Sequence, residues 1–294
     1  MRSLAETVAL ARDIYRSEGL RPLVRATRDG VKARYRELSA RVTRARHRLR
    51  YGDASPEPYE LIHVDPDDIT YCVVPEMQSR FDPPFGTYVV DGEWDAHYAP
   101  TGIWYPTDFE DRDTPLLAKF EQFALHVSLL DHFECGTPWH DTEWYRWIES
   151  RPGYGTHYSD AEATLERFSE VEELYEHIER HGYRTQRELV ADERSPFSAS
   201  TKANPEFHEV IINVGRDGEL IFDDGRHRLS IAKILGLETI PVRVLVRHER
   251  WQALRHEIAN ATRIAELGSR AKRHLDHPDM EDVISPPLQE AIVS

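Results

Sequence analysis

The chain has 294 residues, with 37 Lys and Arg against 52 Asp and Glu, and therefore a formal net charge of −15. This length suffices for one large domain or two ordinary ones. Its two cysteines, Cys72 and Cys135, lie far apart, which excludes a disulfide framework and a cysteine zinc site. With no apolar run long enough to span a bilayer and no apolar signal-peptide core, we expect a cytoplasmic protein.

The basic residues are almost all arginine, 32 of them against five lysines. An acidic, lysine-poor composition is typical of a salt-adapted cytosol, where charge keeps a protein soluble although salt screens self-repulsion. The composition therefore favours a halophilic archaeal source. The alternative is an ordinary acidic protein encoded by a GC-rich genome.

Residues 1–50 carry a net charge of +9, whereas the rest of the chain carries −24. Gly19 and Pro22 divide this segment into two predicted helices, and residues 1–52 form a predicted basic amphipathic arm. Apolar residues in the second helix recur at steps of four and three, which predicts a stripe on one face. The stripe consists of Val31, Tyr35, Leu38, Val42, Ala45 and Leu49. Such a helix can dock on the acidic body, pair with another copy, lie on an anionic membrane or bind nucleic acid.

Residues 53–58 have the composition of a linker, so the folded core is expected over residues 59–247. Within that core, residues 75–160 are rich in proline, glycine and aromatic side chains. We expect this region to be an insertion of short strands and turns, because aromatic residues are rare in disordered loops. An apolar side predicts a helix over residues 114–133, and a further helix is expected over residues 160–182.

The C-terminal region begins with a second apolar repeat. Trp251, Leu254 and Ile258 are spaced by three and four, which predicts a helix within residues 248–275. Residues 276–294 contain three prolines and are predicted to be a flexible tail.

Carboxylates stand beside aromatic rings at Glu93, Trp94 and Asp95, and again between Trp139 and Trp144. Sugar sites are often built in this way, with a ring against the sugar face and carboxylates on its hydroxyls. Glu93, Trp94 and Asp95 are therefore candidate substrate-binding residues. The alternative is an aromatic core with exposed acids.

The segment from Asp223 to Ala232 has the pattern of a strand, a turn and a helix. Predicted strands precede it, a predicted helix starts within it and a further strand follows. These elements are expected at residues 210–214, 220–222, 230–235 and 240–246. A glycine at such a turn lets a ligand approach the backbone, and the following helix N-terminus favours an anion. Arginine and histidine add donors suited to phosphate. The candidate nucleotide-binding residues are Gly225, Arg226, His227, Arg228 and Ser230.

The ordered set of Asp-Gly-Arg-His-Arg-Leu-Ser-Ile-Ala at residues 224–232, Leu235-Gly236 and Ile240-Pro241-Val242 resembles the nucleotide-binding motif of the ParB/sulfiredoxin superfamily. The helix that ends at Gly182 and the segment at residues 62–69 resemble earlier parts of the same fold. The resemblance implies an α+β fold with a ParB/sulfiredoxin-like core. The elements with Trp94 and with Trp139 to Trp144 resemble those of haloarchaeal proteins that carry this motif and are linked to surface-glycan assembly.

Two branches of that superfamily fit this chain poorly. Sulfiredoxins have a catalytic cysteine before the motif histidine, where this chain has Arg226, so sulfinic acid reduction by that route is excluded. ParB partition proteins continue into a long helix-turn-helix domain, whereas only residues 247–294 remain here. The acidic body is also a poor binder of a phosphate backbone, so no nucleic-acid partner is expected.

The remaining branch, the ParB-like free-amino-acid kinases, transfers phosphate from a nucleotide to a small hydroxyl. This resemblance implies ATP or ADP with Mg²⁺ as cofactors and a carboxylate early in the fold, for which Asp65, Asp67 and Asp68 are candidates. Asp224 is a candidate metal ligand or catalytic base. The alternative for Asp223 and Asp224 is that they fix the turn by accepting backbone hydrogen bonds.

The function expected from the sequence is phosphoryl transfer to a small polar substrate. A sugar or sugar-lipid intermediate of cell-surface glycan biosynthesis is the expected substrate. The alternatives are a non-catalytic nucleotide-binding scaffold of such a pathway and a ParB-like DNA-binding regulator. The basic arm could hold the protein at an anionic membrane or form a homo-oligomer.

Overall fold

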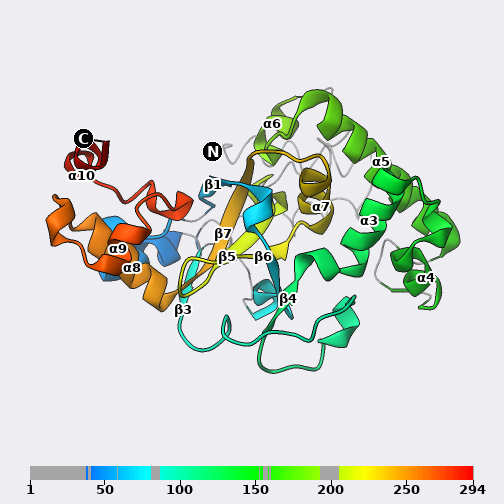
Figure 1. Ribbon diagram of the computed structural model, residues 1–294, viewed down its shortest axis with the longest axis horizontal. Helices are drawn as coiled ribbons and strands as arrows, with labels where there is room; N and C mark the ends of the chain where they lie inside the picture. The colour runs from blue at the N-terminus through cyan, green and yellow to red at the C-terminus, as the bar shows by residue number, and fades with distance from the viewer. Residues whose placement is uncertain are drawn as a thin grey trace, which may run out of the picture.

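The structure, a computed structural model, combines a mixed sheet with surrounding helices, which confirms the α+β class (Figure 1). It describes residues 38, 41–57, 59–80, 87–151, 153–154, 158, 160–192 and 205–293. Most of the basic arm, including Val31 and Tyr35 of its apolar stripe, lies outside the described residues.

The sheet has the strand order β1-β7-β5-β6-β2-β4, and β3 pairs with β7. Its strands are β1 (Leu61–Val64), β2 (Tyr71–Val74), β3 (Tyr88–Val90), β4 (Leu116–Lys119), β5 (Val210–Val214), β6 (Leu220–Asp224) and β7 (Ile240–His248). The pairs β2–β6, β5–β7 and β3–β7 are parallel, and the pairs β1–β7, β5–β6 and β2–β4 are antiparallel. The three strands predicted around the motif are confirmed as β5, β6 and β7.

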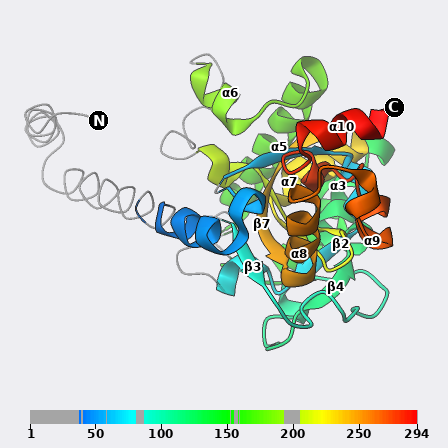
Figure 2. The same cartoon turned by 90° about the vertical axis from the view of Figure 1, so that its left-hand side faces the viewer.

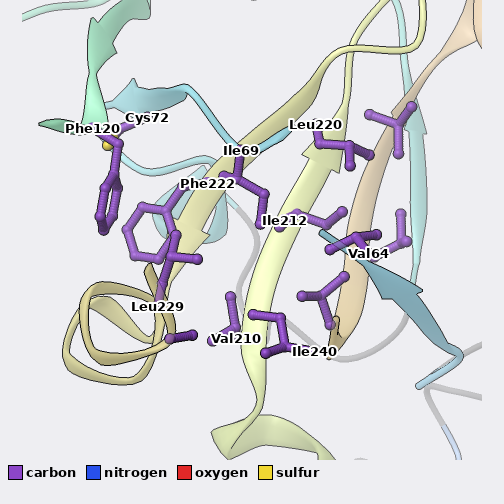
Figure 3. Close-up of a cluster of buried hydrophobic side chains, with 14 of the residues drawn as sticks. Val64, Ile69, Cys72, Phe120, Val210, Ile212, Leu220, Phe222, Leu229 and Ile240 are labelled. Carbon is purple, nitrogen blue, oxygen red and sulfur yellow. The ribbon is translucent and has the colours of Figure 1, made fainter. Parts of the chain in front are cut away.

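Side chains of the central strands alternate between two buried faces. On β6, Leu220 and Phe222 belong to the larger core cluster, and Ile221 between them belongs to the smaller one. Successive side chains of a strand point to opposite faces, so a strand covered on both sides is apolar throughout. In the larger cluster, the ring of Phe120 meets that of Phe222 edge-on at 5.1 Å, beside Leu229 (Figure 3).

The helices agree with the sequence predictions in part. The helices are α3 (Ala124–Cys135), α4 (Glu143–Glu149), α5 (Ala161–His181), α6 (Gln186–Ala191), α7 (Arg226–Ile234), α8 (Glu249–Ala259), α9 (Ser269–Arg273) and α10 (Pro286–Val293). Helix α5 confirms the prediction for residues 160–182, and Asp160 caps it by accepting a hydrogen bond from the Ala163 amide (2.9 Å). Helix α7 begins at Arg226, earlier than the expected start at Ser230.

The helix predicted over residues 114–133 is wrong in its first half. Leu116–Lys119 form β4, which pairs with β2, and the helix starts only at Ala124. A short apolar run buried on both sides cannot be assigned to a strand or a helix by periodicity alone. The expected insertion at residues 75–160 is likewise part of the main body, because it supplies β3 and β4 to the sheet.

The C-terminal prediction also needs correction. The expected helix within residues 248–275 is divided into α8 and α9, and the expected flexible tail contains three fully buried residues, Asp279, Met280 and Leu288. Asp279 forms ion pairs with Arg247 of β7 (2.5 Å) and Arg255 of α8 (3.4 Å), both of which are fully buried. The segment is therefore fixed by charges that lie elsewhere in the chain.

Residues 41–51 are helical and lead into the body (Figure 2). His47 and Tyr51 are buried, whereas Leu38, Val42 and Leu49 are exposed. Of the alternatives for the arm, docking on the body holds for this helix through His47 and Tyr51, whereas the described residues of its apolar stripe take no part in that contact. Within the described part of the chain, no helix is both long and apolar enough to cross a membrane.

Removal of the Asp279 carboxylate tests this view of the C-terminal segment. We expect Asp279→Ala to lower the free energy of unfolding by about 3–5 kcal/mol, because it leaves two buried arginines without their shared partner. Denaturant unfolding monitored by circular dichroism measures the change. Glu176→Gln, which removes an exposed i,i+4 pair with Arg180, is the control and should have little effect. Equal stability of Asp279→Ala and wild type would support a loose tail.

The same ion pairs should make stability depend on acid pH. Burial would raise the pKa of Asp279, but Arg247 and Arg255 overcome that effect and lower it to about 2. Because the folded-state pKa lies below the ordinary value, the stabilisation is complete above about pH 4 and is lost as the pH falls toward 2. The difference in stability between wild type and Asp279→Ala should shrink over that interval.

Candidate functional site

The turn between β6 and α7 has a conformation that requires glycine. Gly225 is the N-terminal cap of α7 and has a φ of 94°. A Cβ atom at this position would also lie 2.9 Å from the Cα of Val210 in β5. Gly225 therefore lets the turn pack closely against the neighbouring strand β5. As a result, α7 starts directly after the end of β6.

Asp223 lies near the end of β6, two residues before Gly225. Its buried carboxylate accepts hydrogen bonds from three groups. It accepts hydrogen bonds from the amides of Met77 (2.8 Å) and Gln78 (3.3 Å) and from the Asn213 side chain (2.7 Å). Burial raises the pKa of Asp223 to about 7, although the bonds from Asn213 and Gln78 oppose that shift. The carboxylate thus joins β6, β5 and the segment after β2, and it titrates near neutral pH.

A cavity of about 150 Å³ opens at this place. It lies beyond the carboxyl ends of the parallel strands β2 and β6, and the first residue of α7 lines it. Its aromatic walls are Trp104, Phe123 and Tyr154, and its charged lining residues are Glu76, Glu110, Asp223 and Arg226. Binding sites of open α/β sheets lie beyond the carboxyl ends of parallel strands, so this cavity is the candidate site.

Two of the basic residues expected at the phosphate position remain accessible. Arg226 is half-buried, lies 4.0 Å from Glu76 and sits over the Phe123 ring at 5.7 Å. His227 is half-buried beside the Arg167 guanidinium, with 3.2 Å between Nδ1 and Nη2. Both belong to the first turn of α7, where helix amides have no intrahelical acceptor. Positive charge and free amides together suit an anion.

Arg228 and Ser230 occupy different positions. Arg228 is buried, pairs with Glu209 (2.9 Å), donates to the carbonyl of Arg184 and lies over the Tyr183 ring at 4.3 Å. Ser230 is fully buried inside α7. Arg228 therefore ties α7 to the chain between α5 and α6, and neither residue lines the cavity.

The carboxylates predicted as catalytic lie outside the cavity. The Asp224 carboxylate accepts a hydrogen bond from the Gly225 amide (2.8 Å) and so fixes the turn. Asp65 accepts from the Asp67 amide (2.8 Å) and caps the 3-10 helix Pro66–Asp68, which includes Asp68. Lys233, in the last turn of α7, pairs with Asp67 (3.4 Å), which places this 3-10 helix near the opposite end of α7.

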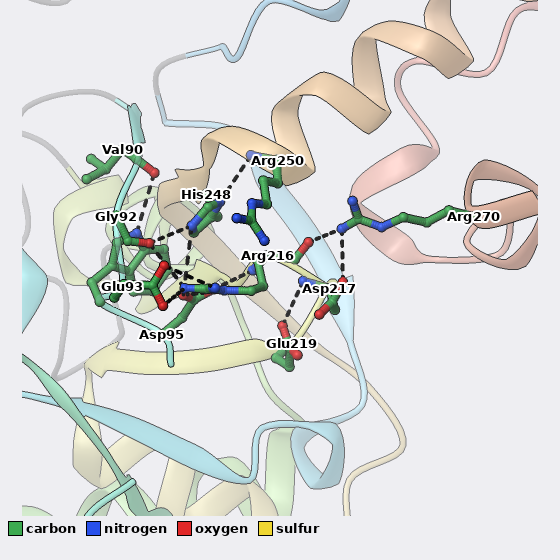
Figure 4. A network of polar contacts seen from close by, with 11 residues as sticks. Val90, Gly92, Glu93, Asp95, Arg216, Asp217, Glu219, His248, Arg250 and Arg270 are labelled. Atoms are coloured by element: carbon green, nitrogen blue, oxygen red, sulfur yellow. Dashed lines mark hydrogen bonds and ion pairs between the residues drawn. The ribbon is translucent and has the colours of Figure 1, made fainter. Parts of the chain in front are cut away.

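The residues predicted to bind a sugar form a separate cluster (Figure 4). The Trp94 side chain is buried and donates to the carbonyl of Val90 (3.4 Å). Asp95 is buried and pairs with Arg216 at 2.6 Å, and the exposed Glu93 reaches the same guanidinium at 3.3 Å. This cluster joins the loop after β3 to the turn between β5 and β6, and none of its three predicted residues lines the cavity.

Sequence reasoning missed Glu76, Glu110 and Tyr154. The available signal was the run Val73-Val74-Pro75-Glu76, in which an apolar strand ends in proline and a carboxylate. The positions of Glu110 and Tyr154 depend on tertiary packing and had no local signal. Among the described residues, no group of three or more histidine, cysteine, aspartate or glutamate side chains is placed to hold a metal ion.

Comparison with known proteins adds no family. No family model matches the chain, and neither a curated protein nor a solved structure matches it. The functional argument therefore depends on the geometry of the site.

The protonation of Asp223 can be tested through stability. Since its folded-state pKa is raised from 3.8 to about 7, the folded protein binds this proton more tightly than the unfolded chain. The stability of wild type relative to Asp223→Asn should therefore fall as the pH rises from about 4 to about 7, and then level off. Urea unfolding of both proteins across this range measures the difference. A relative stability that rises with pH would mean that the three donors outweigh burial.

Proposed function

We propose that the protein binds a nucleotide at the start of α7 and transfers its terminal phosphoryl group to a small polar substrate in the adjacent cavity. The observation that carries this proposal is the convergence of Arg226, the N-terminus of α7 and three carboxylates at one cavity beyond β2 and β6. The order of β6, the Gly225 turn and α7 agrees with the resemblance to a ParB/sulfiredoxin-like nucleotide-binding core, which supports the same proposal.

The size of the cavity limits what it can hold. A cavity of about 150 Å³ is comparable to one that accommodates a single six-membered ring. A whole nucleotide is larger, so its phosphates would reach the cavity only at their terminal end, beside Arg226. Trp104 and Tyr154 offer ring faces, and Glu76 and Glu110 offer acceptors for hydroxyl groups. A single sugar unit or a polar group of similar size fits these walls.

Different side chains of the cavity would bind the phosphate, accept the proton and hold Mg²⁺ in phosphoryl transfer. Arg226 and the first amides of α7 would hold phosphate oxygens, because such reactions depend on positioning and charge neutralisation. Glu76 lines the cavity 4.0 Å from Arg226 and would accept the proton of the attacking hydroxyl. Mg²⁺ usually takes one or two protein carboxylates together with substrate phosphates, and the exposed Glu110 would supply one at this cavity.

Loss of Arg226 should weaken nucleotide binding. We expect Arg226→Gln to raise the Kd for ATP about 10- to 100-fold, because a charge-assisted hydrogen bond contributes about 1.5–3 kcal/mol. Calorimetric titration of ATP, ADP and CTP with Mg²⁺ in high KCl measures the change, with His227→Ala as a second site variant. Arg180→Gln, on the exposed surface of α5, is the matched control and should bind like wild type. No binding of any of the three nucleotides to wild type would contradict the proposal.

Loss of Glu76 should separate binding from turnover. We expect Glu76→Gln to keep ATP binding within a few-fold and to lower the turnover of an accepted substrate by about 100-fold or more. A screen of sugars and other small hydroxyl compounds for ATP-dependent phosphorylation would supply the substrate. An active Glu76→Gln variant would assign proton transfer to another group.

A second candidate is a non-catalytic nucleotide-binding protein. It is favoured by the engagement of Arg228 with Glu209, which keeps one of the expected phosphate ligands away from the cavity. Nucleotide binding that depends on Arg226, without turnover of any substrate in the screen, would support this candidate.

A further inference from the structure

The helical residues 41–51 project from the body of the molecule (Figure 2). The described side chains of the apolar stripe are exposed. The exposed fractions are 61% for Leu38, 51% for Val42 and 91% for Leu49. At about 100° per residue, these side chains and Ala45 fall within an arc of about 60°. His47 lies on the opposite side of the helix and is buried.

The inner side of this helix is fixed to the body by specific contacts. Arg44 and Arg48 both pair with Glu57, the latter at 3.2 Å, and Arg50 pairs with Glu249 of α8 at 2.6 Å. The helix is therefore held in an orientation that directs the apolar stripe away from the protein. A stripe held in this way requires an external surface.

A second copy of the chain is a poor occupant of this stripe. If Leu38, Val42, Ala45 and Leu49 formed a coiled-coil seam, opposite charges would be needed at the positions that flank it. In the sequence those flanking positions are Lys32, Arg34, Ser39, Arg41, Arg46 and Arg48. None of them is acidic, so two parallel copies would bring basic residues against basic residues.

We propose that this arm binds an anionic lipid surface, with the apolar stripe entering the boundary between headgroups and acyl chains. An interfacial helix has apolar side chains on one face and Lys or Arg beside them, and both features are present here. Residues 1–50 carry +9, whereas the remainder carries −24, so the arm is the part of the chain that complements negative lipid. At about 1 M salt the Debye length is only about 3 Å, so the repulsion of the acidic body and the attraction of the arginines both weaken, and burial of the apolar stripe supplies the larger share of the binding.

Nucleic acid would also attract the arginines, but it would not use the apolar stripe. The two partners therefore respond differently to removal of Val42 and Leu49. Both side chains are exposed, so their replacement leaves the packing of the body unchanged. This inference is independent of the nucleotide site.

The test is co-sedimentation of the full chain with vesicles of phosphatidylcholine and phosphatidylglycerol, compared with pure phosphatidylcholine. We expect wild type to bind the mixed vesicles and Val42→Ser/Leu49→Ser to bind them at least about tenfold more weakly. Leu165→Ser removes an exposed leucine of α5 and should bind like wild type.

Three results would overturn the proposal. The first is no binding of wild type to the anionic vesicles. The second is equal binding of wild type and Val42→Ser/Leu49→Ser to the mixed vesicles, because the apolar stripe would then have no part in binding. The third is a wild-type dimer that the double substitution converts to a monomer, measured by light scattering, which would assign the stripe to self-association.

Discussion

Hydrogen bonds to the buried carboxylate of Asp223 hold together the segments on which the candidate site is built. Asn213 donates from β5, and the amides of Met77 and Gln78 donate from the chain that follows β2. The last of these segments also carries Glu76 into the cavity, next to Arg226 of α7. One side chain therefore fixes the relative positions of a carboxylate and a guanidinium that are 150 residues apart in the sequence.

The constraint has an electrostatic consequence. A carboxylate removed from water favours its protonated form, while donors directed at it favour the ionised form. At Asp223 these effects leave a pKa near 7, so the structural junction changes charge close to neutral pH. Because the same group lines the cavity, its charge also alters the field that an anionic ligand meets beside Arg226.

Local sequence patterns predicted the elements whose conformation depends on residues close together in the sequence. The β6 turn and α7 were predictable, because Gly225 adopts a positive φ that few other residues tolerate and apolar runs flank it. The helix predicted over residues 160–182 is α5, and the Asp160 cap that starts it is also a local interaction. In contrast, Leu116–Lys119 form a strand only because β2 is available to pair with them.

The errors in the predicted site have the same origin. The sequence predicted Arg228 as a phosphate ligand. In the folded chain, Arg228 instead pairs with Glu209 and donates to the carbonyl of Arg184. Trp94 and Asp95 resembled a sugar site, but burial and Arg216 make them part of the framework. Asp279 lies in a proline-rich segment that was predicted to be a flexible tail. In the structure it pairs with the buried Arg247 and Arg255, which fix the segment. Each correction depends on a partner distant in the sequence.

Hydrogen–deuterium exchange with and without Mg²⁺–ATP tests most directly whether the cavity beyond β2 and β6 is the ligand site. The account requires protection of two segments, residues 74–80 and residues 223–230, because they form the cavity edge and the first turns of α7. Wild type should show this protection, and Arg226→Gln should show little at the same nucleotide concentration. Protection confined to another region, or none under conditions where binding is measured, would contradict the central claim.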